Sequence, residues 1–177
     1  MQFAQVARIA VFTLLGALAL TVTIIYGVGT ILPVAHVAAT RGELPATRER
    51  VWQVITDWQQ YPTWRSGVTA VEVLSTEAEG AAWVEVDTWG DSLELRTVDI
   101  DAPYRLVTSI GGDEDAPFAG TWTFELDDDG PGTYLCIVEE AEVYDPLSRF
   151  VAAVLTGHAE TMDTYLTDLR QYLEDED

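Results

Sequence analysis

The sequence predicts an α+β fold: a curved antiparallel sheet of about seven strands around one long C-terminal helix, preceded by a single transmembrane helix. Three observations lead to this prediction. An uncharged stretch runs from Ile9 to Leu32, β-rich segments fill residues 34–144, and a helical apolar repeat follows Pro146. Because no helix separates the later strands, we expect them to pair as an antiparallel meander.

The first 33 residues are predicted to form a transmembrane anchor, and residues 34–177 the folded domain. At about 1.5 Å per residue, a helix from Ile9 to Leu32 is long enough to span a hydrocarbon core of about 30 Å. The alternative is a cleaved signal peptide, whose apolar region is usually only about 7–15 residues long. Small residues at 37–39 leave cleavage open. The arginines do not decide the side of the membrane on which the domain lies.

Seven segments rich in β-branched and aromatic residues are predicted as strands, since glycine, proline or acidic turns bound them. They are Val34–Leu44, Val68–Ser75, Ala82–Trp89, Ser92–Asp101, Tyr104–Ile110, Phe118–Leu126 and Thr133–Tyr144.

Two helical regions complete the prediction. One begins near Thr47, whose hydroxyl suits a helix N-terminus, and is interrupted near Pro62 because proline disfavours helical geometry at the residue before it. The other is expected to run from Pro146 to about Leu173 as one continuous helix that covers the mouth of the sheet. Its inner face is predicted to carry Val151, Val154, Leu155, His158, Met162, Tyr165, Leu169 and Leu173.

The stretch from Leu44 to Val68 carries a family resemblance. Its pattern VW..I.DW..YP.W consists of Val51, Trp52, Ile55, Asp57, Trp58, Tyr61, Pro62 and Trp64, with Pro45 before it. This pattern resembles the START-like (SRPBCC) superfamily, which has a helix-grip fold, and within it the polyketide cyclase/dehydrase and lipid-transport proteins. The resemblance continues through Gly120–Leu135 and the last helix, over about residues 35–173. It implies a ligand cavity beneath the long helix and specifies no reaction.

The charge is strongly acidic. Asp and Glu number 30 against 9 basic residues, the net charge is −21, and every basic residue is arginine. Such a surface is typical of a halophilic protein, because concentrated salt screens the repulsion among carboxylates. The alternative is an acidic surface that binds a cationic partner. A nucleic-acid partner is excluded, since a phosphate backbone requires a basic patch.

The sequence predicts no metal and no cofactor. The single cysteine, Cys136, lies in a strand pattern and is interpreted as a small buried apolar residue. Histidines and cysteines do not occur at metal-ligand spacings. Hydrolase, metalloprotease, phosphate-binding and dinucleotide-binding motifs are also absent from the sequence.

Six residues are predicted to line the cavity: Trp64, Trp122, Phe124, Val154, His158 and Met162. His158 lies among apolar residues, either as a polar contact or general acid/base in the cavity, or as a core histidine paired with a nearby carbonyl or carboxylate. The core interpretation is favoured, because the sequence shows no partner that would set its pKa. Trp122 fits a cavity wall and ordinary core equally well, and at least one glutamate of the last strand is a candidate for facing inward.

One strand offers two opposite faces. Trp83, Glu85, Asp87 and Trp89 alternate along it, and the favoured interpretation places them in water, with Val84, Val86 and Thr88 inside. The reason is that two unpaired buried carboxylates would be costly.

The favoured functional hypothesis is a membrane-anchored domain that binds a hydrophobic small molecule or lipid between the sheet and the last helix. Two alternatives remain open at this point: a cyclase- or dehydratase-like enzyme that uses His158, and a protein-interaction module whose cavity is filled by side chains. No catalytic residue is assigned.

Overall fold

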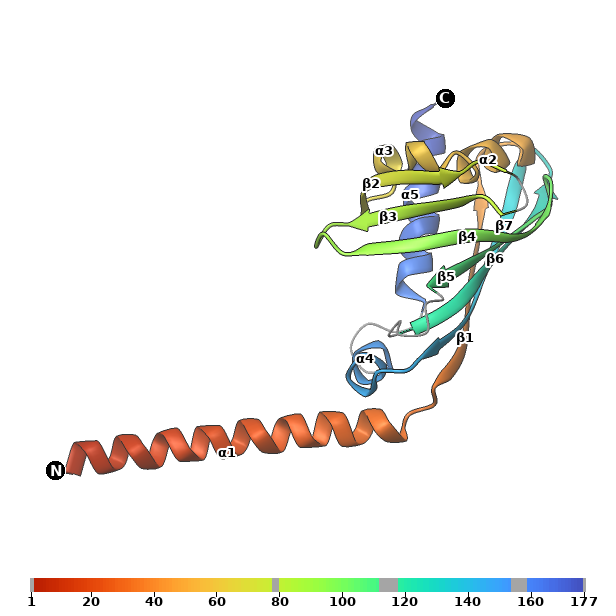
Figure 1. The fold of residues 1–177 in the computed structure, drawn as a ribbon. Helices are drawn as coiled ribbons and strands as arrows, with labels where there is room; N and C mark the ends of the chain where they lie inside the picture. The colour runs from red at the N-terminus through yellow and green to blue at the C-terminus, as the bar shows by residue number, and fades with distance from the viewer. Residues whose placement is uncertain (1, 78–79, 112–117, 154–158, 177) are drawn as a thin grey trace.

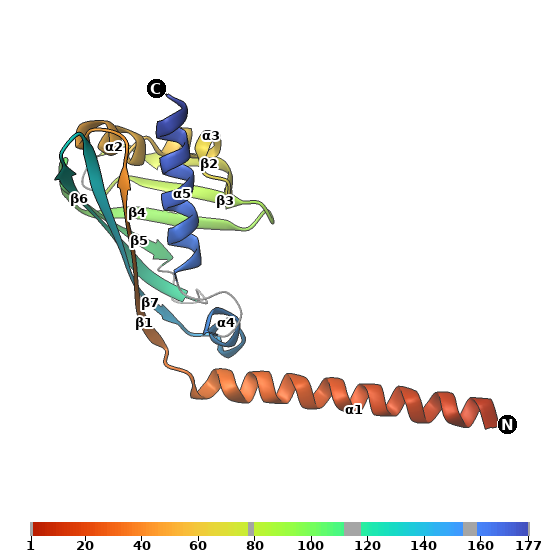
Figure 2. The ribbon, with the colours of Figure 1, turned by 180° about the vertical axis from the view of Figure 1, so that it is seen from behind.

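The computed structural model describes residues 2–77, 80–111, 118–153 and 159–176. One antiparallel sheet curves around helix α5 (Glu160–Asp175), and the long helix α1 (Gln2–Ile31) extends away from the domain (Figures 1 and 2). The predicted fold class is therefore confirmed.

Within the described residues the sheet has seven strands in the order β1-β7-β6-β5-β4-β3-β2, and every neighbouring pair is antiparallel. Strands β2 to β7 follow each other as a meander, and β1 closes the far edge against β7. The strands are β1 (Ala35–Leu44), β2 (Val68–Ser75), β3 (Ala82–Asp87), β4 (Ser92–Asp101), β5 (Arg105–Gly111), β6 (Phe118–Asp129) and β7 (Gly132–Val143).

Short helices connect β1 to β2. Helix α2 (Arg48–Ile55) begins as predicted, with the Thr47 hydroxyl accepting a hydrogen bond from the backbone N–H of Arg50. The 3-10 helix η1 (Trp58–Gln60) and helix α3 (Tyr61–Trp64) follow, and Pro62 lies in the first turn of α3, where its missing N–H costs nothing. The Tyr61 hydroxyl donates to the carbonyl oxygen of Ile55 at 2.7 Å, which fixes the turn between these helices.

The core lies between α5, α2 and the concave face of the sheet. Helix α5 contributes Met162, Tyr165, Leu166, Leu169 and Leu173, all buried. The strands contribute buried residues that include Leu106, Leu126, Leu135 and Ile137. Each large apolar side chain buried in this way stabilises the fold by roughly 1.5–3 kcal/mol.

The predicted continuous C-terminal helix is wrong. Helix α4 (Pro146–Val151) and α5 are separate, and the bend residue Ala159 precedes α5. The sequence between them contains Gly157, whose helix propensity is low. The separation allows α4 to pack mainly against α1 and only slightly against the sheet, at β7.

The contact between α1 and α4 is unusually close. A Cβ atom at Gly29 would lie only 1.9 Å from the carbonyl oxygen of Pro146. Glycine is therefore the residue that allows this approach. Arg149 of α4 also donates from Nη1 to the carbonyl oxygen of Leu32 at 3.1 Å, which satisfies a backbone group just beyond the end of α1.

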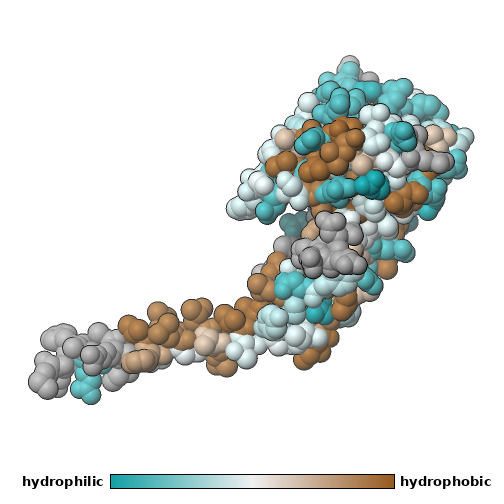
Figure 3. Space-filling view, in the orientation of Figure 1, coloured by the Kyte–Doolittle hydropathy of each residue, from teal (hydrophilic) through white to brown (hydrophobic). Residues whose placement is uncertain are grey.

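Helix α1 contains the segment Ala10–Ile31, 22 residues with a mean hydropathy of 2.2, almost all of them exposed apart from Gly29 at the contact with α4. Figure 3 shows this apolar surface along α1, whereas the surface of the domain on the same side mixes hydrophilic, intermediate and hydrophobic patches. By length and composition the segment is able to cross a membrane.

Candidate ligand-binding site

A cavity of about 1010 Å³ lies where the beginning of α5, the α3–β2 connection and the ends of strands β3 to β6 meet. Val68, Leu93 and Phe118 contribute apolar surface to its lining. Its charged lining residues are Arg65, Glu85, Asp87, Asp91, Glu94 and Arg96. The site thus combines apolar wall with charged groups, and its volume is at the upper end of the range of ordinary ligand pockets.

A buried ion pair forms part of the wall. Arg65 Nη1 lies 2.7 Å from Glu85 Oε1, and the two side chains are only 13% and 9% exposed. The Trp83 indole N–H donates to the same carboxylate oxygen at 2.9 Å. The Arg65 guanidinium also lies over the rings of Tyr61 and Tyr165, 4.8 Å and 4.9 Å from their centroids.

This arrangement corrects the prediction that Trp83 and Glu85 face water. Both are buried, and the Trp83 ring stacks on Trp58 at a centroid distance of 4.5 Å. The prediction assumed the free-energy cost of burying an unpaired carboxylate. Glu85 is paired, because Arg65 donates a hydrogen bond to it. Val84 and Val86, predicted inside, are only half-buried, and Thr88 is exposed. Trp89 is exposed, as predicted.

Four of the predicted cavity residues lie in the closed core beside the cavity. Trp64, Trp122, Phe124 and Met162 are at most 8% exposed. The rings of Trp64, Trp122 and Phe124 surround Tyr165 at centroid distances of 5.2, 6.0 and 5.5 Å. Among the described lining residues of the cavity, none of these four occurs. The other two predicted residues, Val154 and His158, lie outside the described residues.

Four buried polar atoms of this interior have no partner within hydrogen-bonding geometry among the described residues: Trp58 Nε1, Trp64 Nε1, Thr97 Oγ1 and Tyr165 Oη. The neighbouring Tyr61 hydroxyl donates its own proton to Ile55, so it is available to the Tyr165 hydroxyl only as an acceptor. Buried polar groups normally bond to protein, water or ligand. The interior therefore contains hydrogen-bonding groups that the described side chains do not satisfy.

A second polar group lies on the strands β1, β6 and β7. His36 Nε2 lies 2.7 Å from Glu139 Oε1, and the Trp122 indole N–H donates to Glu139 Oε2 at 2.5 Å. Glu139 is thus a half-buried glutamate of the last strand with two partners. Sequence reasoning did not select His36, although its pairing with Ala141 across β1 and β7 places it two residue pairs from Glu139, on the same face of the sheet.

Burial raises the pKa of Tyr165 to about 12, while the nearby Arg65 guanidinium opposes that rise. Burial also raises the pKa of Tyr61 well above its ordinary value. In the unfolded chain a tyrosine loses its proton near pH 10. Between pH 10 and 12 the unfolded state therefore releases a proton that the folded state keeps, so stability falls as pH rises.

We expect this loss to reach about 3 kcal/mol above pH 12 for Tyr165 alone. Urea unfolding of the full-length chain in detergent, repeated from pH 8 to pH 12, measures the loss. The variant Tyr165→Phe should have lower stability at pH 8 but a clearly shallower decline above pH 10. An unchanged decline in this variant would contradict the assignment.

Comparison with known proteins assigns the chain to a protein family. The model of one family, described as polyketide cyclase/dehydrase and lipid transport, matches residues 35–174, nearly the whole domain after α1. The chain belongs to this family. The match begins at the first residue of β1 and ends in α5, so the family's unit is the sheet with its helices, and α1 lies outside it.

Solved structures of similar fold agree with this membership. A START superfamily protein from Mycobacterium smegmatis superposes with a TM-score of 0.61 at 18% identity, covering 80% of this chain and 99% of that one. The Zhui aromatase/cyclase from Streptomyces sp. R1128 superposes with a TM-score of 0.65 at 16% identity, covering 79% and 94%. At these identities the likeness establishes the fold of this family member and nothing about its reaction.

A curated protein named alanine racemase, from Synechocystis sp., is 30% identical over 104 residues. The match spans 58% of this chain but only 26% of that protein's length. The family member thus resembles about a quarter of that protein.

Proposed function

We propose that this chain is a membrane-anchored member of the family that binds a hydrophobic small molecule or lipid in the cavity between the sheet and α5. The observation that carries the proposal is the cavity itself, about 1010 Å³ in volume, at the open end of a sheet whose other end is closed by a packed aromatic core. Its size suits a lipid, an isoprenoid quinone or a polyketide-type molecule.

The lining supports a ligand with an apolar body and a polar end. Val68, Leu93 and Phe118 offer apolar contact, and burying a ligand's apolar area contributes roughly 25 cal/mol per Å². The charged groups Asp87 and Arg96 also line the cavity, so a polar end of the ligand has hydrogen-bonding partners there.

The anchor is supported by the exposure of α1. Large side chains such as Phe12 and Leu14 are 73% and 72% exposed, along a segment that contacts α4 only near its C-terminal end. Water is a poor environment for so much apolar surface, and a bilayer removes it from water. We propose the same single-pass arrangement for the protein in its host membrane. The acidic surface of the domain would keep it soluble in concentrated salt.

The variant Thr161→Trp tests the proposal. Thr161 is exposed on α5 and lines the cavity, so an indole there fills part of the space without entering the packed core. We expect overpacking of the ligand site to cost about 1–3 kcal/mol, which corresponds to roughly five- to 150-fold weaker binding. Thr164→Trp, also exposed on α5 but away from the described lining, is the matched control.

The full-length chain in detergent is incubated with a panel of lipids, quinones and aromatic polyketides, and the retained ligand is quantified by mass spectrometry. The wild type and Thr164→Trp should retain one class of ligand, and Thr161→Trp should lose it. Equal retention by all three chains would mean that the molecule lies in the detergent around α1, and the cavity proposal would fail.

A cyclase- or dehydratase-like activity is the second candidate, favoured by one observation: the charged pair Arg65–Glu85 lies on the cavity wall. The same incubation separates the two. A ligand recovered chemically unchanged supports binding and transport, whereas a cyclised or dehydrated product supports the enzyme. The filled-cavity interaction module has less support, since the space beside α5 is open.

A further inference from the structure

The tip of the β3–β4 hairpin presents an exposed tryptophan. Trp89 is 89% exposed, an unusual state for the largest apolar side chain. The turn that carries it is held firmly: Asp87 Oδ1 accepts from the backbone N–H groups of Trp89 and Asp91 at 2.8 and 2.9 Å, and Gly90 has a φ of +89°. The indole is therefore positioned by a well-defined turn.

Helix α4 presents further apolar side chains close to α1. Leu147 and Val151 are 51% and 37% exposed. The contact of Gly29 with Pro146 and the hydrogen bond from Arg149 to Leu32 hold α4 at the point where α1 ends. If α1 crosses a bilayer, α4 lies at the interface of that bilayer, where an amphipathic helix places its apolar side chains among the lipid head groups.

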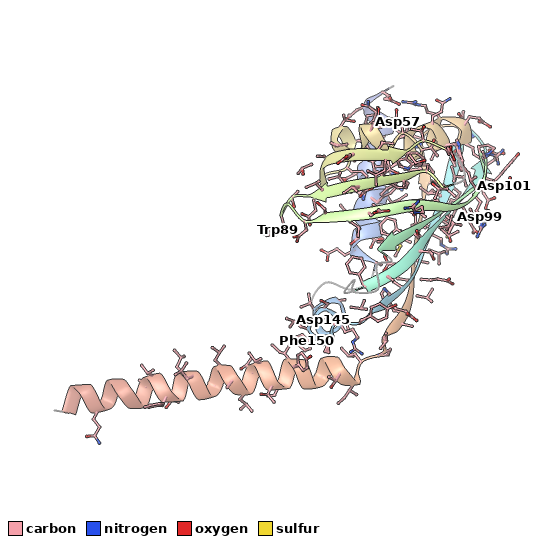
Figure 4. The ribbon with its side chains drawn as sticks, viewed as in Figure 1. Asp57, Trp89, Asp99, Asp101, Asp145 and Phe150 are labelled. Atoms are coloured by element: carbon pink, nitrogen blue, oxygen red, sulfur yellow. The ribbon has the colours of Figure 1, made fainter. Side chains whose placement is uncertain are left out.

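Both features lie on the side of the domain toward which α1 extends. The β3–β4 hairpin reaches back from the sheet in the direction of the N-terminal half of α1 in both ribbon views (Figures 1 and 2). In Figure 4 Trp89 lies at that end of the sheet, Phe150 lies on α4 next to α1, and Asp99 and Asp101 lie at the opposite end. Trp89 and α4 therefore face the membrane that α1 would enter.

We propose that Trp89 and α4 dock the domain on the surface of the lipid bilayer that α1 crosses. This docking rests on the membrane anchor of the proposed function. Tryptophan favours this interface, where its ring is buried among lipids and its N–H remains hydrated. Asp87 and Asp91 flank Trp89 and also line the cavity, so docking brings the cavity to the bilayer. A hydrophobic ligand then passes between membrane and cavity without crossing bulk water.

The acidic charge of the chain defines the kind of lipid surface. With a net charge of −21, the chain is repelled by anionic lipids, and salt screens that repulsion. Docking through an indole and aliphatic side chains is a hydrophobic contact with neutral or zwitterionic lipid. It is therefore retained or strengthened in concentrated salt, the opposite of the behaviour of a basic membrane-binding surface.

Site-specific fluorescence of the full-length chain tests this proposal. An environment-sensitive probe is attached at Thr88→Cys, which is exposed next to Trp89, in a Cys136→Ser background. The chain is reconstituted in phosphatidylcholine vesicles, some of which carry a quencher at a shallow position of the acyl chain. Val98→Cys, 54% exposed and adjacent to Asp99 at the far end of the sheet, is the matched control position.

We expect a blue shift and lipid quenching of the probe at position 88, retained in concentrated salt, and aqueous emission at position 98. Adding Trp89→Ser should return the probe at position 88 to aqueous emission. Equal emission at the two positions, or quenching that survives Trp89→Ser, would overturn the docking. Vesicle flotation, scored first, separates the two proposals: a chain that does not float overturns the anchor together with the docking, whereas a floating chain with an aqueous probe at position 88 overturns the docking alone.

Discussion

Replacing Arg65 with methionine is expected to lower the free energy of unfolding by about 3–5 kcal/mol, because the change leaves Glu85 buried without its cation. The Glu85 side chain is only 9% exposed, so water replaces the lost partner only in part. The variant also loses the guanidinium that lies over the rings of Tyr61 and Tyr165. Urea unfolding of the full-length chain in detergent, at constant ionic strength, measures the loss.

Two controls separate the buried ion pair from a general effect of removing charge. Adding Glu85→Gln to Arg65→Met should restore much of the stability, since the neutral amide oxygen still accepts the hydrogen bond from Trp83. The surface pair Arg96–Glu94 is about half exposed, at 52% and 51%, so Arg96→Met should cost no more than about 1 kcal/mol. Similar losses for Arg65→Met and Arg96→Met would contradict the assigned role.

Trp64→Ala should cost about 3–5 kcal/mol of stability, the usual range for removing a large aromatic side chain from a core. Trp64 is 8% exposed, and its ring packs against Tyr61, Tyr165 and Tyr172 at centroid distances of 5.3, 5.2 and 6.2 Å. Thermal and urea unfolding measure the effect. Trp64→Phe should lose clearly less, since a ring remains in the cluster.

The matched control for this variant is Trp89→Ala, at the exposed hairpin tip, which should change stability by no more than about 0.5 kcal/mol. If Trp64→Ala were as stable as the wild type but lost ligand, Trp64 would line the ligand cavity, as the sequence alone predicted, and would not belong to the packed core. If Trp89→Ala were the more destabilised variant, the assignment of both side chains would be wrong.

The order and type of the elements were predictable because each is encoded locally. Alternation, turn residues and the Thr47 and Pro62 signals define the strands and short helices without reference to the rest of the chain. The aromatic motif of residues 51–64 was also informative, since Tyr61 and Trp64 pack into the core and Trp58 stacks on Trp83. Its conspicuous aromatic residues therefore belong to the packing of the domain.

The wall of the cavity was not predictable, because it depends on pairs far apart in the sequence. Arg65 and Glu85 are 20 residues apart on different elements, and each alone is typical of an exposed residue. The division of the last helix into α4 and α5 is related in the same way to α1, because Gly29 of α1 allows the backbone of Pro146 to pack closely against it. In both cases a partner elsewhere in the fold reverses the local preference.

The position of the cavity along the sheet also differs from the prediction. Trp122 and Phe124 do face α5, as alternation along β6 indicated, but Tyr165 fills the space in front of them. The open volume lies toward the beginning of α5, where Leu93, Phe118 and Thr161 line it. Alternation identifies the inner face of a strand, whereas side-chain packing decides where along that face a cavity remains.

Native mass spectrometry of the full-length chain, extracted from its host membrane in high salt, tests ligand binding most directly. We predict a stoichiometric apolar molecule bound to the wild type and lost in Thr161→Trp, whose new indole occupies the cavity. Lipid analysis of the extract would then identify the ligand class. A wild-type chain that is free of ligand, and that takes up none from a lipid and quinone panel, would contradict the proposal and favour an interaction module instead.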